Sequence, residues 1–233
     1  MKYISIIAII ILATSCNNSK RGSGNIVTET RNVSTFTKVN AATSIDVDVQ
    51  QGAETSVIVE ADDNLIKYVE TKVEDGELKI RLKNISIWNE STIKVHIIAP
   101  KYDGFSASSS SEIMGKNTIT STSMIKLKAS SSANINIEID APSVDVEASS
   151  SADITAAGRT KEVKVDGSSS ALIVLDKLQA ETVTAEASSS ADVSVFASVK
   201  ITAKANSSGD ITYTGGATDV NKSESSSGSV NKK

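Results

Sequence analysis

Through most of the chain an apolar residue stands at every second position, with a polar residue between. Val144 and Val146, for example, alternate with Asp145 and Glu147. Successive side chains of a β-strand point to opposite faces, so a period of two predicts strands with one buried and one solvated face. No helical period competes with this pattern. The sequence therefore predicts an all-β fold.

A serine-rich segment recurs seven times in the second half of the chain. It begins at Ala107, Ala129, Ala148, Gly167, Ala187, Ala205 and Glu224, with intervals of 22, 19, 19, 20, 18 and 19 residues. Six residues after each start stands a β-branched aliphatic residue, namely Ile113, Ile135, Ile154, Ile173, Val193, Ile211 and Val230. Such self-similarity at a fixed period is the signature of a repeat architecture.

Each repeat is interpreted as strand, serine-rich bend, strand and connection. A two-strand unit of about 19 residues cannot enclose a core alone, but stacked units bury a continuous apolar column. We therefore predict a β-solenoid, similar to a right-handed β-helix, over residues 26–231. Residues 101–231 form the serine-rich repeats, and residues 26–100 form less regular first turns or a cap. Near the C-terminus Lys222 replaces an inward apolar residue, and we expect its charge to blunt the open edge.

The N-terminal residues have the pattern of a secretory signal. Lys2 precedes an apolar run from Ile4 to Ala13, which is too short for a stable membrane-spanning helix. The run leads into Ala13-Thr-Ser-Cys16, which resembles the lipobox of bacterial lipoproteins. We predict that residues 1–15 are a lipoprotein signal peptide, that Cys16 is the site of lipid attachment, and that residues 16–25 are a flexible tether. The other interpretation is an ordinary secretory signal with an incidental cysteine.

Composition excludes several classes of function. One cysteine and one histidine cannot supply a zinc site or a disulfide framework. A Ser-His-Asp catalytic triad would have to use the only histidine of the chain, so we expect no such triad. A net charge of -4 gives no basic footprint, so we expect no nucleic-acid partner. We expect no catalytic residue, no metal and no cofactor. The chain has 38 serines, but 39% apolar residues suffice for a core.

Four features remain as candidates for ligand chemistry. The serine clusters are either a hydroxyl array for a repetitive ligand or, as we favour, small residues that fit a tight bend. Asp153, Asp192 and Asp210 share a column, which we interpret as solvated acids rather than a calcium site. His96 has outward parity and is expected at the surface. Trp88 is either a packing residue of the cap or an exposed anchor for a partner.

The order of several motifs resembles one known family. The lipobox, Phe36-Thr-Lys-Val39, Ile45-Asp-Val-Asp-Val-Gln-Gln-Gly52, Leu65, Gly76-Glu-Leu-Lys-Ile80, the serine bends and Gly209-Asp-Ile-Thr-Tyr-Thr-Gly215 together resemble the head GIN domain family of putative auto-transporter adhesins, common in Bacteroidota. The resemblance implies a β-helical shape like that of pectin lyases, without conserved catalytic residues, and a role in cell adhesion. It also implies Gly-Ser-Gly at the bends. Because serine in place of glycine disfavours positive φ, we expect the serine bends of this chain to avoid left-handed conformations.

The sequence thus indicates an exported, lipid-anchored binding or adhesion module of the cell envelope, in the outer membrane. Its partners are expected to be the membrane through the lipid, a glycan or protein ligand, and other copies of the chain in a homo-oligomer. The ligand-binding residues are unknown at this point. The alternatives are a degenerate polysaccharide-active enzyme and a purely structural spacer.

Overall fold

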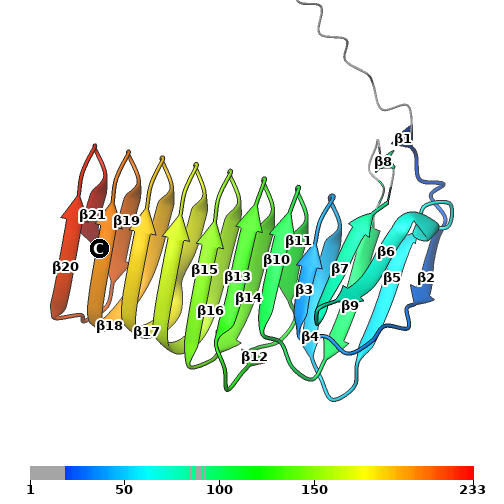
Figure 1. Ribbon diagram of the computed structural model, residues 1–233, viewed down its shortest axis with the longest axis horizontal. Helices are drawn as coiled ribbons and strands as arrows, with labels where there is room; N and C mark the ends of the chain where they lie inside the picture. The colour runs from blue at the N-terminus through cyan, green and yellow to red at the C-terminus, as the bar shows by residue number, and fades with distance from the viewer. Residues whose placement is uncertain (1–18, 84, 88–90, 92) are drawn as a thin grey trace, which may run out of the picture.

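The computed structural model describes residues 19–83, 85–87, 91 and 93–233. It is a β-solenoid of about seven turns, with 64% of residues in strands and parallel pairings about 20 residues apart (Figure 1). The predicted fold is therefore confirmed. No helix among the described residues is long and apolar enough to span a membrane.

Each rung of the solenoid consists of two strands joined by a tight turn. The strands that lead into the turns form one sheet, here called the entry sheet, and the strands that follow form the exit sheet. The entry sheet contains β3 (Lys38–Ala41), β7 (Glu77–Leu82), β10 (Gly104–Ser108), β13 (Ile125–Ser130), β15 (Ser143–Ala148) and β20 (Asp219–Glu224). The exit sheet contains β4 (Asp46–Gln51), β9 (Ile93–Ala99), β11 (Glu112–Gly115), β14 (Asn134–Asp140), β19 (Asp210–Thr214) and β21 (Ser229–Lys232).

Three long strands connect the two sheets at the corner opposite the tight turns. They are β16 (Asp153–Gly167), β17 (Leu172–Ala187) and β18 (Asp192–Ala205), and each begins in the exit sheet and ends in the entry sheet. The short strand β12 (Ile119–Thr120) lies in the connection of the longest repeat and pairs with β14. Gly158 has a φ of 112° in β16, and a Cβ there would lie 2.1 Å from the carbonyl oxygen of Ile139. Only glycine fits this corner.

The core is the apolar column that the repeat predicts. The seven β-branched residues six positions after each repeat start pair in register from rung to rung, and all are buried. Val47 and Val95 continue the column into the first rungs. Next to the tight turns the two sheets converge, and the inward positions hold small side chains such as Ala129, Ala133 and Ala148. A larger side chain would force the sheets apart there.

The N-terminal end departs from the parallel pattern. The antiparallel strands β2 (Ile26–Thr30), β5 (Ser56–Asp62) and β6 (Val69–Glu74) cover the rung formed by β7 and β9. A 3-10 helix, η1 (Ile66–Tyr68), lies between β5 and β6, and an Asp75-Gly76 turn with positive φ at both residues joins β6 to β7. This cap pairs the backbone edge that a parallel stack leaves open. β1 (Ser19–Lys20) pairs with β8 (Ser86–Ile87) beside it.

At the C-terminal end a lysine stands in the inward column. Lys222 pairs with Ala203 in the inward column, and its Nζ donates a hydrogen bond to the carbonyl oxygen of Val230 at 2.8 Å. The same Nζ lies 5.0 Å from the centre of the Tyr213 ring. The ammonium group therefore occupies the place of the next apolar layer, as expected of an edge protected against stacking.

Candidate functional site: a row of serine turns

The tight turns form a continuous row along one edge of the solenoid (Figure 1). In seven of them the two central residues are serines with φ between 48° and 63°. The N–H of the fourth residue donates to the carbonyl of the first, for example from Ala152 to Ser149 at 3.3 Å. Positive φ at both central positions with this hydrogen bond is typical of a type I′ turn. The expectation that the serine bends avoid left-handed conformations is therefore wrong.

Backbone hydrogen bonds between neighbouring turns explain why the serines accept this conformation. The N–H of the second central serine donates to the carbonyl of the first central serine in the next turn, as from Ser132 to Ser150 at 3.0 Å and from Ser151 to Ser169 at 3.0 Å. The pattern continues through the whole row, starting with Ser44 and Ser109 at 2.9 Å. The stack thus satisfies the turn backbone and outweighs the local strain of left-handed serine.

The hydroxyl groups of the central serines point to solvent. All fourteen residues are exposed, and none of their hydroxyls makes a hydrogen bond to another described residue. The fourteen are Ser109, Ser110, Ser131, Ser132, Ser150, Ser151, Ser169, Ser170, Ser189, Ser190, Ser207, Ser208, Ser226 and Ser227. With rungs about 4.8 Å apart, seven turns make a row about 29 Å long. The row is therefore a regular array of hydroxyl pairs that are free to bind a partner.

Acidic residues flank the row on both sheets. On the exit sheet Asp153, Asp192 and Asp210 are exposed, and Asp192 stacks directly on Asp210. On the entry sheet Glu147 stacks on Asp166, and Lys128 pairs with Glu147 at 3.1 Å. Exposed carboxylates on both sides give the row a polar, hydrated border.

Lysines on the entry sheet hold the Glu147 carboxylate in its charged form. Lys126 Nζ donates to a Glu147 oxygen at 2.5 Å and contacts Asp145 at 3.3 Å. These hydrogen bonds, first from Lys126 and then from Lys128, lower the pKa of Glu147. Lysines and carboxylates of neighbouring rungs therefore form ion pairs along the sheet. These carboxylates do not gather at one point, as the ligands of a metal ion would.

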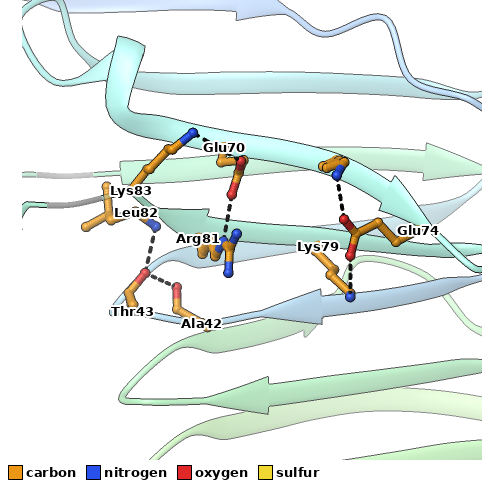
Figure 2. Close-up of polar contacts among 9 residues, drawn as sticks. Ala42, Thr43, Glu70, Glu74, Lys79, Arg81, Leu82 and Lys83 are labelled. Atoms are coloured by element: carbon orange, nitrogen blue, oxygen red, sulfur yellow. Dashed lines mark hydrogen bonds and ion pairs between the residues drawn. The ribbon is translucent and has the colours of Figure 1, made fainter.

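The turn at Thr43 and Ser44, which precedes the seven serine turns, is held by β7. Figure 2 shows the Thr43 hydroxyl between the N–H of Leu82, from which it accepts at 2.8 Å, and the carbonyl of Ala42, to which it donates at 2.5 Å. The same figure shows the ion pairs of the cap, with Glu74 close to Lys79 at 2.6 Å. Hydrogen bonds from Lys72 and Lys79 lower the pKa of Glu74 to about 2.

A pocket of about 340 Å³ lies at the foot of this first turn. Both polar and apolar residues line it, namely Thr43, Ser44, Leu82, Ile85, Ser86, Ile87, Ser91 and Ile93. A partly apolar pocket therefore lies at the capped end of the row of turns.

His96, the remaining candidate among the described residues, lies apart from the row. The His96 side chain is 39% exposed on the outer surface of β9, as its parity predicts, with its ring nitrogens 3.4 Å from Asp48 and 3.4 Å from Glu60. Within the described ranges no three His, Cys, Asp or Glu residues are grouped as metal ligands. Cys16 and Trp88 lie outside the described residues, so the structure does not describe the predicted lipid-attachment site or the tryptophan.

Residues 35–217 match the family model described as "Putative auto-transporter adhesin, head GIN domain". The chain belongs to this family. The resemblance seen in the motifs is therefore confirmed. No curated protein shows significant similarity to the chain.

Solved structures show the same fold at low sequence identity. A putative adhesin from Bacteroides fragilis superposes with a TM-score of 0.86 at 21% identity, covering 92% of this chain and 100% of that chain. A putative adhesin from Parabacteroides distasonis has a TM-score of 0.75 at 21% identity, covering 93% and 100%. A putative lipid binding protein from the same species has a TM-score of 0.73 at 22% identity, also covering 93% and 100%.

Proposed function

We propose that the chain is an exported, lipid-anchored binding or adhesion module of the cell envelope that does not turn over a substrate. Membership of a family of putative adhesins supports a binding role. The observation that carries the proposal is the row of exposed hydroxyl pairs on left-handed serines. Glycine would adopt this conformation without strain, so the serines cost stability that the turn itself does not require.

The row fits a partner that is itself repetitive. Each rung presents the same pair of hydroxyls, so individually weak contacts add along the row if the partner repeats at a matching distance. A glycan chain and another copy of this protein are the partner classes we propose. Binding is therefore expected to be multivalent and weak per contact.

Surface retention of the purified protein tests this function. The chain from Cys16 onward should bind immobilised envelope or host glycans, or itself, and should not cleave them. A variant with glycine in three neighbouring turns should lose binding while keeping its fold, because glycine removes the hydroxyls and accepts positive φ. The changes are Ser150→Gly, Ser151→Gly, Ser169→Gly, Ser170→Gly, Ser189→Gly and Ser190→Gly.

The matched control changes serines outside the row, with Ser143→Ala and Ser194→Ala, and should bind like the unchanged protein. Cleavage of a polysaccharide that one acidic substitution abolishes would contradict the proposal in favour of the enzyme. Absence of both binding and cleavage would leave only a spacer.

The anchor of this module is proposed at Cys16, in the outer membrane. Several acyl chains on one residue give the stable membrane affinity that a single chain lacks. In cells, Cys16→Ala should abolish incorporation of labelled fatty acid and either release the protein from the membrane fraction or leave it unprocessed. The same substitution at a neighbouring polar residue, Ser19→Ala, is the control and should change neither. Unchanged labelling of the Cys16→Ala variant would contradict the anchor.

A further inference from the structure

The segment that follows Cys16 is fastened to the capped end of the solenoid. The N–H of Gly24 donates to Asp62, a buried carboxylate, at 2.6 Å, and the Ser23 hydroxyl donates to Asp63 at 2.6 Å. At Gly22 a Cβ would lie 2.4 Å from Asp62 Oδ2, so this close contact needs glycine. Residues 19–25, part of the tether expected from the sequence, are thus docked in the structure.

This docking limits how far Cys16 lies from the cap. Ser19 pairs with Ser86, and only three residue steps separate Ser19 from Cys16. A fully extended chain covers at most about 3.6 Å per residue, so Cys16 lies within about 11 Å of β1. A lipid on Cys16 therefore brings this end of the solenoid to the bilayer surface.

The same end carries a cluster of lysines around one tyrosine. The Nζ atoms of Lys20 and Lys67 lie 5.5 Å and 5.4 Å from the centre of the Tyr68 ring, and the N–H of Lys83 donates to the Tyr68 carbonyl at 2.9 Å. Lys20 and Lys67 form no ion pair with any carboxylate in the described part of the chain, and Lys83 forms one long ion pair, with 3.9 Å between its Nζ and a Glu70 oxygen. Like charges gathered in this way repel one another unless an anionic partner is present.

Apolar side chains accompany these lysines. Ile26, at the start of β2, is 47% exposed, and it pairs with Asp62, which holds the docked segment. Ile85 and Ile87 flank Ser86, which pairs with Ser19. Ile26 is the exposed aliphatic residue of this group, whereas Ile85 and Ile87 are half-buried and Ile87 packs partly against the core. Lysine and tyrosine next to an exposed aliphatic side chain are typical of surfaces that contact the headgroup region of a bilayer.

We infer that the capped end is a membrane-facing surface on which Lys20, Lys67 and Lys83 bind the anionic headgroups of the bilayer that carries the lipid of Cys16. This inference rests on the proposed lipid anchor. The contact holds the solenoid in one orientation instead of letting it swing on a free tether. Figure 1 shows β1 and β8 at the end of the molecule opposite the C-terminus, so the distal rungs point away from this contact.

Chemical footprinting of lysines on a bilayer tests the inference. The chain from Cys16 onward, which retains every described residue, is coupled through its only thiol to a maleimide lipid in vesicles. Lysine acylation is then measured by mass spectrometry on phosphatidylcholine alone and with phosphatidylglycerol added. Each lysine near an anionic surface shifts a binding equilibrium by about fivefold at moderate salt. Acylation of Lys20, Lys67 and Lys83 should therefore fall by at least about fivefold on the anionic vesicles.

Two sets of lysines serve as controls. Lys161 and Lys164 are exposed on β16, in a rung distant from the cap, and their acylation should not depend on the lipid. In a Lys20→Gln, Lys67→Gln variant the protection of Lys83 should disappear, whereas a Lys161→Gln, Lys164→Gln variant should retain it. Raising the salt to about 0.5 M should also remove the protection, because it screens the headgroup charge.

Equal acylation of the three lysines on both lipids, or equal protection of the distant lysines, would overturn the inference. The chemical coupling does not depend on lipidation in the cell. A negative footprint together with normal fatty-acid labelling of Cys16 would therefore refute the membrane-facing surface and leave the anchor intact.

Discussion

Replacing Ser169 and Ser170 by glycine tests the strain in the serine turns. The two residues have φ values of 52° and 61°. A left-handed conformation costs about 1–2 kcal/mol for a residue with a Cβ. Glycine avoids this cost but loses about 0.5–1 kcal/mol more backbone entropy on folding. The net gain is about 0.5–1 kcal/mol per residue, so the double variant should be about 1–2 kcal/mol more stable.

No side-chain hydrogen bond to a described residue offsets this gain. Neither hydroxyl makes a hydrogen bond to a described residue, and the N–H of Ser170 keeps its bond to the Ser189 carbonyl in the glycine variant. Urea unfolding followed by circular dichroism measures the difference as a higher midpoint at unchanged slope. The gain in stability should appear together with loss of any ligand that binds the hydroxyl row.

The control is Ser194→Gly, a strand serine of β18 whose φ is not positive. Glycine there should destabilise the protein by about 0.5–1 kcal/mol, because strand residues gain nothing from positive φ. If the double turn variant were destabilised as much as this control, the serines would stabilise the turns through their side chains. The inference that they are retained for binding would then fail.

Three further predictions concern the core, the end and the charges. Ile154→Asp should unfold or strongly destabilise the protein in a thermal melt, whereas Asp153→Ala should change little, because only the first buries an unpaired carboxylate; equal melting temperatures would contradict the burial assignment. Lys222→Val should promote self-association in light scattering by restoring an apolar end, and a strictly monomeric variant would show that the lysine is not needed there. In the folded protein the pKa of Glu74 is lowered to about 2 and that of Glu147 is also lowered, so the stabilising contribution of each carboxylate is present above its unfolded pKa and is lost as the pH falls through its folded pKa. Glu74→Gln should therefore lower stability at pH 7, with a difference that shrinks as the pH falls through about 2, and a difference at pH 2 as large as that at pH 7 would contradict the ion pairs.

The repeat made most of the fold predictable. The seven β-branched residues, the first Ile113 and the last Val230, stand at the same position of each repeat. When the repeats stack as rungs, these residues form one buried column. Because strand parity is fixed, the same pattern placed Asp153 and His96 on the outer faces. The alternating pattern therefore predicts both the buried residues of the core and the residues of the solvated surfaces.

The cap was predicted only in outline, since its pairing depends on contacts between distant residues. The antiparallel strand β5 lies between β2 and β9, and nothing in the local pattern of Ser56–Asp62 specifies its direction. Likewise residues 22–25 dock on Asp62 and Asp63, which lie about 40 positions later in the sequence. The sequence pattern does not predict contacts over this separation. Only the Asp75-Gly76 turn had a recognisable local signal.

Local propensity alone does not predict the turn conformation. Intrinsic preference disfavours positive φ at serine. The preference is overridden by the turn-to-turn hydrogen bonds, such as that from Ser190 to Ser207 at 3.1 Å, which exist only once the rungs are stacked. Seven consecutive Ser-Ser pairs at the repeat period were the available signal, because stacking identical turns is the condition for such a ladder.

The spacing of the row also discriminates between partners. The hydroxyl pairs repeat about every 4.8 Å, whereas an extended peptide repeats its side chains on one face about every 6.7 Å. These two distances come into register only about once in 34 Å, which exceeds the length of the row. A peptide laid along the turns therefore gains almost nothing from the repetition, and multivalency is lost when geometry forbids simultaneous contacts. A second solenoid laid alongside has the same 4.8 Å period and meets every rung in register. Self-association through the row thus has no mismatch to overcome, and a glycan competes with it only if its own repeat lies close to the rung spacing.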